Sequence, residues 1–391
     1  MSRDIDGSRI DAVLADAVER GAVPHVAAIA ADRDGVFYEG GAGVRVAGES
    51  GDPVGAGTQF RIMSMTKMVC TAAALQQVER GELDLDAPVE QYCPEFADVQ
   101  VLEGFDGDTP RLVEPASKAT VHQLVTHTTG LGYWFWNAEL LQYETATGIP
   151  NVVPGSARAF EAPMVAHPGT RFVYGINTDW LGKVVEAVAG TTLDEVVAAG
   201  ITGPLGMTDT MFRLDEGRKA NCVAIHTRGQ DGRWTAVEEI LNQEPDWWAG
   251  GHGLYSTPRD YTRFERALLR GGELDGERIL SEETVDRAFT NQIGDLDFPA
   301  EIPTVDPPIT DSLRAGPAHT WGYGLLLNTE DQPGRRRAGT GAWAGLFNTH
   351  FFIDRTTGVC ASIYTNSLPF IEQDGAWRVY GEFEEALYAA L

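Results

Sequence analysis

The sequence predicts an α+β fold: one antiparallel sheet built from both chain ends and flanked by helices, with a mainly helical region inserted between them. Strand-like runs gather near both termini, whereas helical patterns dominate the middle of the chain. Strands from opposite ends can share one sheet only if the region between them is an insertion. We therefore expect two domains, one from residues 1–60 and 316–391 and one from 61–315, with the functional site at their interface.

The N-terminal elements are expected to be a helix and a hairpin. The apolar residues of segment 8–20 share one helical face: Ile10, Val13, Leu14 and Val18. Two strand-like runs follow between residues 24 and 47. They are separated by Asp32-Arg33-Asp34-Gly35, which is typical of a hairpin turn.

The remaining elements follow from the same patterns. Helices are expected over 67–80, 120–126, 179–189 and 258–269, and the proline-rich segment 302–310 predicts a loop. Near the C-terminus three further strands are expected over 321–328, 346–354 and 358–366, closed by a helix over about 376–390.

The composition excludes several classes of partner. The chain has 391 residues, with 30 Lys and Arg against 57 Asp and Glu, a formal charge of −27. So acidic a protein repels nucleic acid and anionic membrane surfaces. No uncharged apolar run reaches the ~18 residues that a membrane span needs. We expect neither nucleic acid nor a membrane as partner, and the oligomeric state stays open.

Other sequence features predict a cytoplasmic enzyme without a metal or cofactor. The N-terminus lacks the apolar core and the basic residues of a secretory signal, and the four cysteines are scattered without a CxxC pair. No GxSxG, HExxH or Walker A string is present. Residues 339–344 match the GxGxxA form of the dinucleotide motif, but a strand-like run follows where that motif requires a helix.

Ser64, three residues before Lys67, is the strongest candidate nucleophile. On a helix these two positions share a face, so the hydroxyl and the ammonium are neighbours. A serine needs such a partner to react, and lysine can serve if burial keeps it partly neutral. The flanking residues are apolar, which a solvated lysine rarely tolerates on every side. The alternative is a serine at a helix N-terminus beside an exposed lysine.

Four segments in order carry a resemblance to a known family. They are QFRIMSMTKMVC and its continuation (59–96), LVTHTTGL (124–131), PGTRFVYGINTDW and its continuation (168–190), and GGHGLYSTPRDYTRF (250–264). With them the chain resembles the serine β-lactamase/penicillin-binding protein superfamily over nearly its whole length. Within it, the sequence is most similar to the family VIII carboxylesterases, relatives of the class C β-lactamases. The resemblance implies a β-lactamase-like fold and a serine hydrolase without a cofactor.

The resemblance also implies catalytic roles. Ser64 would be the acylated nucleophile, Lys67 its partner and Tyr174 the second base. Nearby lysine charge, which lowers the pKa of a phenol, would hold Tyr174 as a phenolate or a hydrogen-bonded phenol. Tyr174 would relay a proton from Ser64 to the leaving alcohol and later activate the deacylating water. The backbone N–H groups of Ser64 and Leu346 would bind the oxyanion.

Two departures from the lactamase pattern favour an ester substrate. Lactamases carry Tyr-x-Asn, whereas here Ile176 stands two residues after Tyr174 and Asn177 comes one position later. In place of the Lys-Thr-Gly motif the chain has Trp343-Ala344-Gly345, similar to the Trp-x-Gly of the esterases. The missing lysine removes a cation for a lactam carboxylate, and a tryptophan offers an apolar wall to a neutral ester. Asn177, Trp343 and Gly345 are candidate substrate contacts.

An aromatic run supplies further candidate substrate contacts. Tyr133, Trp134 and Trp136 directly follow the LVTHTTGL segment, and four consecutive aromatic residues in a loop are awkward to bury as ordinary core. We expect these three to line an acyl or alcohol pocket. The alternative is packing between the helical region and the sheet.

Three other polar groups have structural interpretations. His127 is expected to satisfy backbone groups at a helix end, and Asp179 to cap the helix that starts at Trp180. The short basic run Arg335–Arg337 is expected to be a solvated strand edge.

The sequence thus predicts a serine esterase that cleaves small-molecule esters, with short-chain or small aromatic acyl groups, through an acyl-enzyme on Ser64. An acyltransferase or a promiscuous β-lactamase could use the same Ser64, Lys67 and Tyr174. A non-catalytic ligand-binding member of the fold is the second alternative, although a binder would need none of these three residues chemically.

Overall fold

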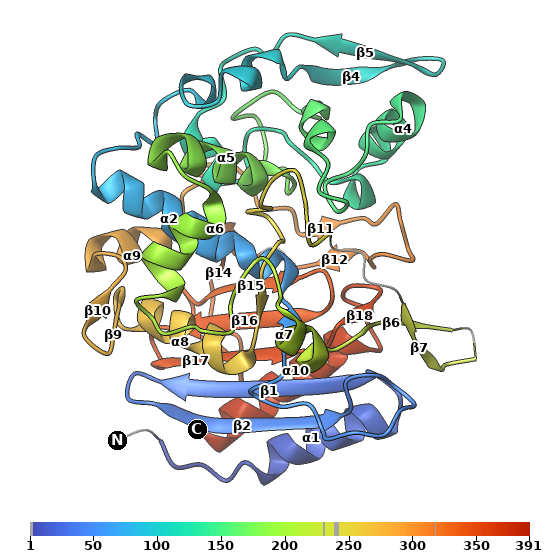
Figure 1. Cartoon of the computed structure of the whole chain (residues 1–391), viewed down its shortest axis with the longest axis vertical. Coiled ribbons are helices and arrows are strands. Elements are labelled where there is room, and N and C mark those ends of the chain that lie inside the picture. The colour runs from blue at the N-terminus through green and yellow to red at the C-terminus, as the bar shows by residue number, and fades with distance from the viewer. Residues whose placement is uncertain (1–2, 230, 238–241, 317) are drawn as a thin grey trace.

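A seven-stranded antiparallel sheet joins the two ends of the chain in the computed structural model, which describes residues 3–229, 231–237, 242–316 and 318–391 (Figure 1). The strand order is β13-β14-β15-β16-β17-β1-β2. Its strands are β1 (His25–Asp32), β2 (Val36–Gly43), β13 (His319–Trp321), β14 (Leu326–Asn328), β15 (Gly341–Gly345), β16 (Thr349–Asp354) and β17 (Val359–Tyr364). β1 pairs with β17, so that Ala28 faces Ile363. The expected sheet from both chain ends is therefore confirmed.

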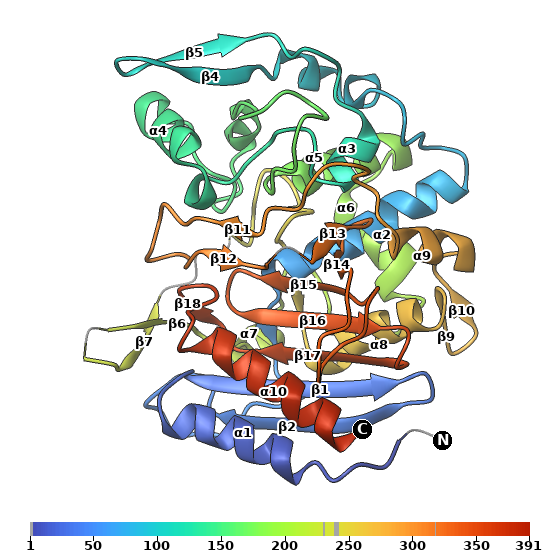
Figure 2. The same cartoon turned by 180° about the vertical axis from the view of Figure 1, so that it is seen from behind.

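Helices cover both faces of this sheet. α1 (Ser8–Glu19) and α10 (Ala376–Ala390) lie side by side on one face, as Figure 2 shows. α8 (Pro258–Leu269) packs against β1 and β17 on the other face. Every residue of β1 is buried because both of its faces are covered, which explains its nearly continuous run of alanine, valine and isoleucine.

The inserted helical region begins with α2 (Thr66–Glu79), which lies above β15 in Figure 1. Its other helices are α3 (Val121–Val125), α4 (Ala138–Thr147), α5 (Asn177–Ala189), α6 (Leu193–Val197), α7 (Glu216–Asn221) and α9 (Glu282–Ala288). Its short strands form hairpins or pairs: β3 (Phe60–Arg61) with β8 (Tyr255–Ser256), β4 (Val101–Asp106) with β5 (Thr109–Val113), β6 (Ile225–Arg228) with β7 (Trp234–Val237) and β18 (Ser367–Leu368), β9 (Glu273–Leu274) with β10 (Glu277–Arg278), and β11 (Glu301–Ile302) with β12 (Leu313–Arg314).

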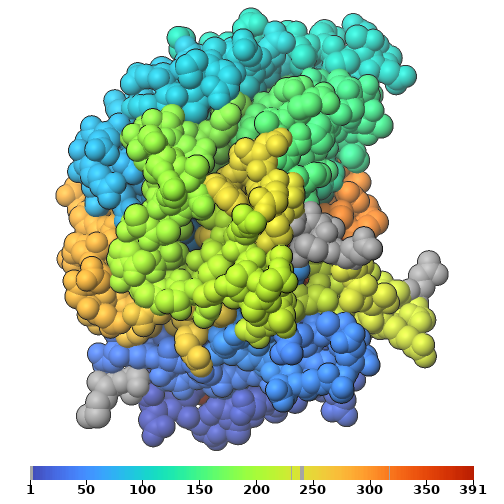
Figure 3. Space-filling view, in the orientation of Figure 1, coloured from blue at the N-terminus to red at the C-terminus, as the bar shows by residue number. Residues whose placement is uncertain are grey.

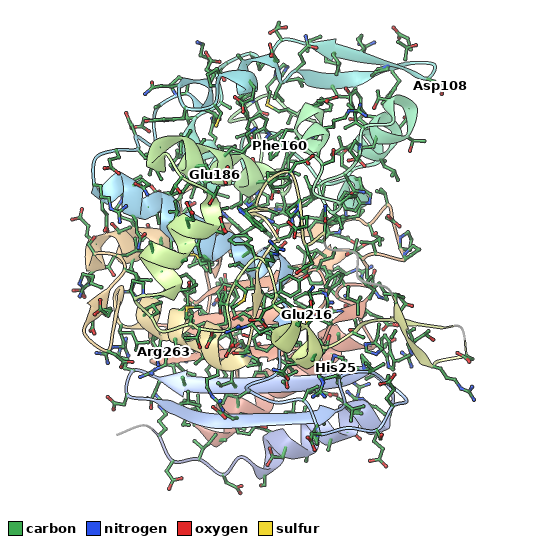
Figure 4. All side chains as sticks on the ribbon, in the orientation of Figure 1. His25, Asp108, Phe160, Glu186, Glu216 and Arg263 are labelled. Carbon is green, nitrogen blue, oxygen red and sulfur yellow. The ribbon has the colours of Figure 1, made fainter. Side chains whose placement is uncertain are left out.

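Helix α2 is buried along most of its length. Its small residues Ala72, Ala73 and Ala74 are wholly buried, and α5 packs against it. Phe160, labelled near α5 in Figure 4, packs edge-on against Trp180 of α5 with ring centroids 4.8 Å apart. In Figure 3 the green and yellow segments of the helical region form a continuous surface over the middle of the molecule. Any polar side chain that α2 carries toward the sheet is therefore removed from solvent.

Three strand boundaries differ from the expectation. Segment 321–328 is not one strand, because Gly322 and Leu325 close a turn by a hydrogen bond of 2.8 Å and Gly324 adopts a φ of +74°. β15 was not expected as a separate strand. The predicted strand 346–354 begins only at Thr349, since residues 346–348 form the turn after β15. The proposed domain boundaries at 60/61 and 315/316 stay a prediction.

The basic run near β15 also differs from the expectation. Arg336 is buried rather than solvated, and its guanidinium lies 2.7 Å from the carboxylate of Glu384 on α10. Arg335, by contrast, is partly exposed and pairs with Glu385 at 2.7 Å. Among the helices that the structure describes, none is long and apolar enough to cross a membrane.

Candidate active site

Ser64 lies in a single turn of 3₁₀ helix, Met63–Met65, between β3 and α2. Met63 has a φ of +46°, a left-handed conformation that is strained for a residue with a side chain. The turn is held by a hydrogen bond from the Ile62 N–H to the Leu254 carbonyl, at 3.2 Å. Ser64 itself is half-buried and lines a small cavity, so its hydroxyl is held at a fixed place with access to a ligand.

Lys67 is buried one turn further along α2, with 1% of its surface exposed. Its ammonium nitrogen Nζ donates to Ser64 Oγ at 3.2 Å, to the Tyr133 hydroxyl at 2.9 Å and to the Gly251 carbonyl at 2.8 Å. The same nitrogen lies 4.9 Å from the centre of the Tyr174 ring. The expected neighbourhood of serine and lysine is therefore present, and Tyr133 joins it.

The protonation of Lys67 depends on two opposed effects. Burial lowers the pKa of Lys67 below its usual range, and the nearby Asp179 carboxylate opposes that shift. Burial likewise raises the pKa of Asp179, which Lys67 and a hydrogen bond from Gly251 oppose. Burial dominates in both cases, so that each group is easier to neutralise than in water.

Asp179 is not the helix cap that its sequence position predicts. Helix α5 already begins at Asn177, so Asp179 sits inside its first turn. Its carboxylate accepts the Gly251 N–H at 2.8 Å and lies 3.6 Å from Nδ1 of His252. The packing of α5 against α2 turns this carboxylate toward Lys67, which the local sequence pattern does not reveal.

Tyr174 lines the same cavity as Ser64. Its phenol oxygen accepts the indole N–H of Trp343 at 2.8 Å and forms a hydrogen bond with Ser64. Burial raises the pKa of Tyr174, and the two hydrogen bonds oppose this shift without reversing it. The expectation of a lowered phenol pKa is therefore wrong, because desolvation, with a smaller contribution from the Asp179 charge, outweighs the two hydrogen bonds. The raised pKa favours the neutral phenol, which can donate a proton; the catalytic role of Tyr174 stays a proposal.

Strand β15 brings the remaining main-chain groups to Ser64. A Cβ atom on Gly345 would lie 2.2 Å from the Ile62 carbonyl oxygen, so only glycine allows β15 to approach this segment so closely. This approach places Leu346 in the wall of the same cavity as Ser64. The role of the Ser64 and Leu346 N–H groups as an oxyanion hole stays a proposal.

The predicted substrate contacts divide into two groups. Tyr133, Trp134, Trp136 and Trp343 all line the cavity at Ser64, and their role as substrate contacts stays a prediction. Asn177 and Gly345 are buried outside its wall. The Asn177 amide donates to the carbonyls of Leu131 and Val173 at 3.0 and 3.2 Å, and therefore fastens the loop under the aromatic run instead of facing a ligand.

Several lining residues were not expected from the sequence. They are Met63, Phe135, Val152, Val153, His252 and Phe370. Phe135 stands within the aromatic run and His252 within the segment 250–264 that carries the family resemblance, so the sequence could have indicated both. Phe370 and the two valines come from distant loops without a motif, and only the fold brings them to Ser64. Burial, with a smaller effect from Lys67, lowers the pKa of His252 to about 3, so this histidine is neutral.

His127 has the structural role that its position predicts. It is buried, has a φ of +56°, and its Nδ1 accepts the Gly175 N–H at 3.4 Å. Its ring packs against that of Tyr174, with centroids 4.7 Å apart. It therefore supports the tyrosine rather than acting on Ser64. Among the described residues no cluster of His, Cys, Asp and Glu could hold a metal ion.

We expect the pKa of the buried Lys67 to set the pH dependence of the reaction. Only its neutral amine can take a proton from Ser64, so kcat/KM should fall as pH is lowered through the pKa of Lys67. We expect the midpoint of this acidic limb well below the ordinary lysine pKa of about 10.4. In Asp179→Asn it should move to still lower pH, because the carboxylate that raises the pKa of Lys67 is gone. A midpoint near the ordinary lysine value, or one that Asp179→Asn moves upward, would contradict this role.

A substitution at Gly251 gives a second test of the arrangement of Lys67 and Asp179. A Cβ atom at this position would lie 2.6 Å from the Asp179 carboxylate, while the Gly251 carbonyl accepts from Lys67. Gly251→Ala should push both groups apart and lower kcat by about tenfold to a hundredfold, in line with small misplacements of catalytic groups. Gly51→Ala is the control because a Cβ atom there meets nothing within 4 Å and, as at Gly251, the φ of this glycine is not positive. Equal effects of the two variants on kcat would refute the positioning role.

A comparison with protein families identifies the chain over almost its full length. Residues 10–382 match the family model described as Beta-lactamase. The chain is 31% identical over 360 residues to monacolin J acid methylbutanoyltransferase of Aspergillus terreus, an alignment that covers 86% of this chain and 83% of the relative. It is 32% identical over 366 residues to lovastatin esterase of Penicillium rubens, which covers 90% of each chain.

The fold agrees with this comparison. The solved structure of unliganded simvastatin synthase (LovD) from Aspergillus terreus superposes with a TM-score of 0.83 and 28% identity, covering 97% of each chain. The resemblance deduced from the ordered motifs and the β-lactamase-like fold that it implied are therefore both confirmed.

Proposed function

The chain belongs to the beta-lactamase family and is a serine enzyme of its hydrolase and acyltransferase branch, and from this premise we propose that it hydrolyses carboxylic esters. The observation that carries the proposal is the contact of Ser64 with two proton-handling groups, Lys67 and Tyr174. A nucleophile that touches both a base and an acid can be acylated without a metal ion.

The proposed acylation uses each of these groups once. Neutral Lys67 takes the proton of Ser64 as Oγ forms a bond to the ester carbonyl carbon. The carbonyl oxygen becomes an oxyanion, which the N–H groups of Ser64 and Leu346 stabilise. When the bond between carbon and the alcohol oxygen breaks, Tyr174 gives its proton to the departing alcohol. The Lys67 ammonium then restores the proton of Tyr174.

In deacylation, a water molecule takes the place that the alcohol occupied in acylation. A water molecule in the alcohol position loses a proton to neutral Lys67 and attacks the acyl carbon. The bond from carbon to Ser64 Oγ breaks, and the Lys67 ammonium returns a proton to Ser64 as the carboxylic acid departs. Lys67 is therefore the base in both half-reactions.

The walls of the cavity support an ester rather than a β-lactam. No lysine or arginine lines it among the described residues, so a lactam carboxylate has no charged partner there. Trp343 occupies the position of the missing lysine and donates its N–H to Tyr174. The protein thus uses this position to orient a proton donor instead of binding an anion.

Acyl transfer is the second candidate function. Its support is the 31% identity to a methylbutanoyltransferase, comparable to the identity to the esterase. The two reactions share the acyl-enzyme and differ only in whether water or an alcohol removes the acyl group.

Product analysis with p-nitrophenyl acetate tests the proposal. We expect an initial burst of nitrophenol, followed by turnover to acetate, and much slower opening of the lactam nitrocefin. Added butanol should divert only a minor part of the acetyl group to butyl acetate. Butyl acetate as the main product would support the transferase instead, and faster turnover of nitrocefin than of the ester would support a lactamase. The cytoplasmic location remains our proposal, which cell fractionation can test.

A further inference from the structure

A second cavity of about 490 Å³ lies against the catalytic one, on the side of β15 that faces α10. Successive residues of a strand point to opposite faces, and here Ala342 packs with the core that contains α10 whereas Trp343 packs with the core that contains Tyr174. The cavity at Ser64 holds only about 30 Å³ of free space by the same measure. Ligand sites for small molecules typically hold about 300–1,000 Å³. Of these two adjoining cavities, the second therefore has the size of a ligand site.

The two cavities share a wall. Trp136, Trp343, Ala344 and Phe370 line both of them. A large group of a substrate held at Ser64 can therefore extend past these four side chains and toward α10. Figure 2 shows α10 and the strands β15 and β16 on this side of the molecule.

The lining of the second cavity favours an uncharged apolar group. Its inner wall includes Ala342, Phe370 and Trp377. Four arginines line it, and each has a carboxylate partner: Arg335 pairs with Glu385 at 2.7 Å, Arg336 with Glu384 at 2.7 Å, Arg378 with Glu382 at 2.8 Å, and Arg314 with Glu301 at 3.4 Å. Because each arginine already has a carboxylate partner, the rim offers no excess charge to attract an ion.

The position of Tyr174 decides which half of the ester enters this cavity. The proposed proton donor is bound to the indole N–H of Trp343, the residue that separates the two cavities. The departing alcohol must be next to this proton donor, hence on the Trp343 side of Ser64. The acyl group is left with the small space bordered by Met63, Val153 and Leu346.

We infer that the second cavity binds the alcohol part of the substrate, and that the enzyme acts on esters that join a small acyl group to a bulky, uncharged, apolar alcohol. The inference rests on the proposed function. It adds to it a binding site whose floor is the α10 face of β15.

Gly381 of α10 gives a way to fill this cavity selectively. It lines the cavity, and the three atoms nearest to a Cβ atom there all belong to the guanidinium of Arg335, the flexible end of a partly exposed side chain. Gly381→Leu should therefore occupy the cavity without a backbone clash. Ala389→Leu is the matched control, since it adds bulk to an exposed position of the same helix.

The test compares phenyl acetate with 4-cyclohexylphenyl acetate, whose alcohols differ by one apolar ring and leave with similar ease. We expect kcat/KM of the wild type to favour the larger ester, and Gly381→Leu to lower the ratio of the two kcat/KM values by at least about tenfold, the loss typical of a blocked apolar pocket. Ala389→Leu should keep the wild-type ratio, and thermal melting checks that both variants fold.

The outcomes separate the two proposals. If the wild type cleaves phenyl acetate but Gly381→Leu leaves the ratio unchanged, the cavity is not the alcohol site and the esterase proposal stands. If neither ester is cleaved, the proposed function itself fails.

Free 4-cyclohexylphenol gives a second measurement on the unmodified protein: it should inhibit phenyl acetate hydrolysis competitively and more strongly than phenol. Equal inhibition by the two phenols would also overturn the inference.

Discussion

Ser64→Ala is expected to lower kcat/KM for p-nitrophenyl acetate by about 10⁴-fold or more, the scale of nucleophile removal in serine enzymes. The variant keeps the cavity and the aromatic walls, so it should still bind the ester while it has no atom to accept the acyl group. The hydroxyl contacts only Lys67 and Tyr174 in the described part of the chain, and its loss should not unfold the protein. Initial rates over a range of ester concentrations measure the effect.

The control for this variant is its melting temperature, which should stay close to that of the wild type. A folded Ser64→Ala protein that retains activity within tenfold of the wild type would show that another group attacks the ester. In that case the contact between Lys67 and Ser64 would have no catalytic role.

Tyr174→Phe is expected to lower kcat by about 10²-fold to 10⁴-fold, the range for loss of a positioned proton donor. The phenol is the group next to both Ser64 and Trp343, so without it the alcohol must leave as an alkoxide or wait for a solvent proton. The loss should be largest for alkyl esters, whose alcohols are poor leaving groups, and smallest for p-nitrophenyl esters.

Tyr133→Phe is the matched comparison, because it removes the same atom from the neighbouring ring. The Tyr133 hydroxyl contacts Lys67 at 2.9 Å. Its removal should affect the pH dependence set by Lys67 more than the preference for good leaving groups. If Tyr133→Phe instead shows the strong dependence on the leaving group and Tyr174→Phe does not, the proton donor has been assigned to the wrong tyrosine.

The sequence alone was sufficient to predict those features that depend on residues close to one another in the chain. Helix α8 has the predicted bounds, Pro258–Leu269, because its proline at the first position and its threonine cap are both encoded locally. The contact of Ser64 with Lys67 follows from the spacing of two residues on one helix. The aromatic wall was predicted from a run of large side chains that a loop cannot easily bury elsewhere.

Other features depend on how distant segments pack and could not be deduced locally. Asp179 looked like a helix cap, and only the approach of α5 to α2 turns it toward Lys67. The phenol pKa of Tyr174 was expected to fall beside a cation, but the depth of its burial decides the sign. Arg336 is buried because α10 supplies Glu384, a partner nearly fifty residues away along the chain.

The central claim is that Ser64 carries the acyl group, and intact-protein mass spectrometry after rapid acid quench tests it most directly. With p-nitrophenyl acetate in excess, we predict a mass increase of one acetyl group per chain, located by peptide mapping on Ser64 and formed at the rate of the nitrophenol burst. The increase should be missing from Ser64→Ala. Rapid ester turnover with the acetyl group on another residue, or with the same adduct on the Ser64→Ala protein, would contradict the account.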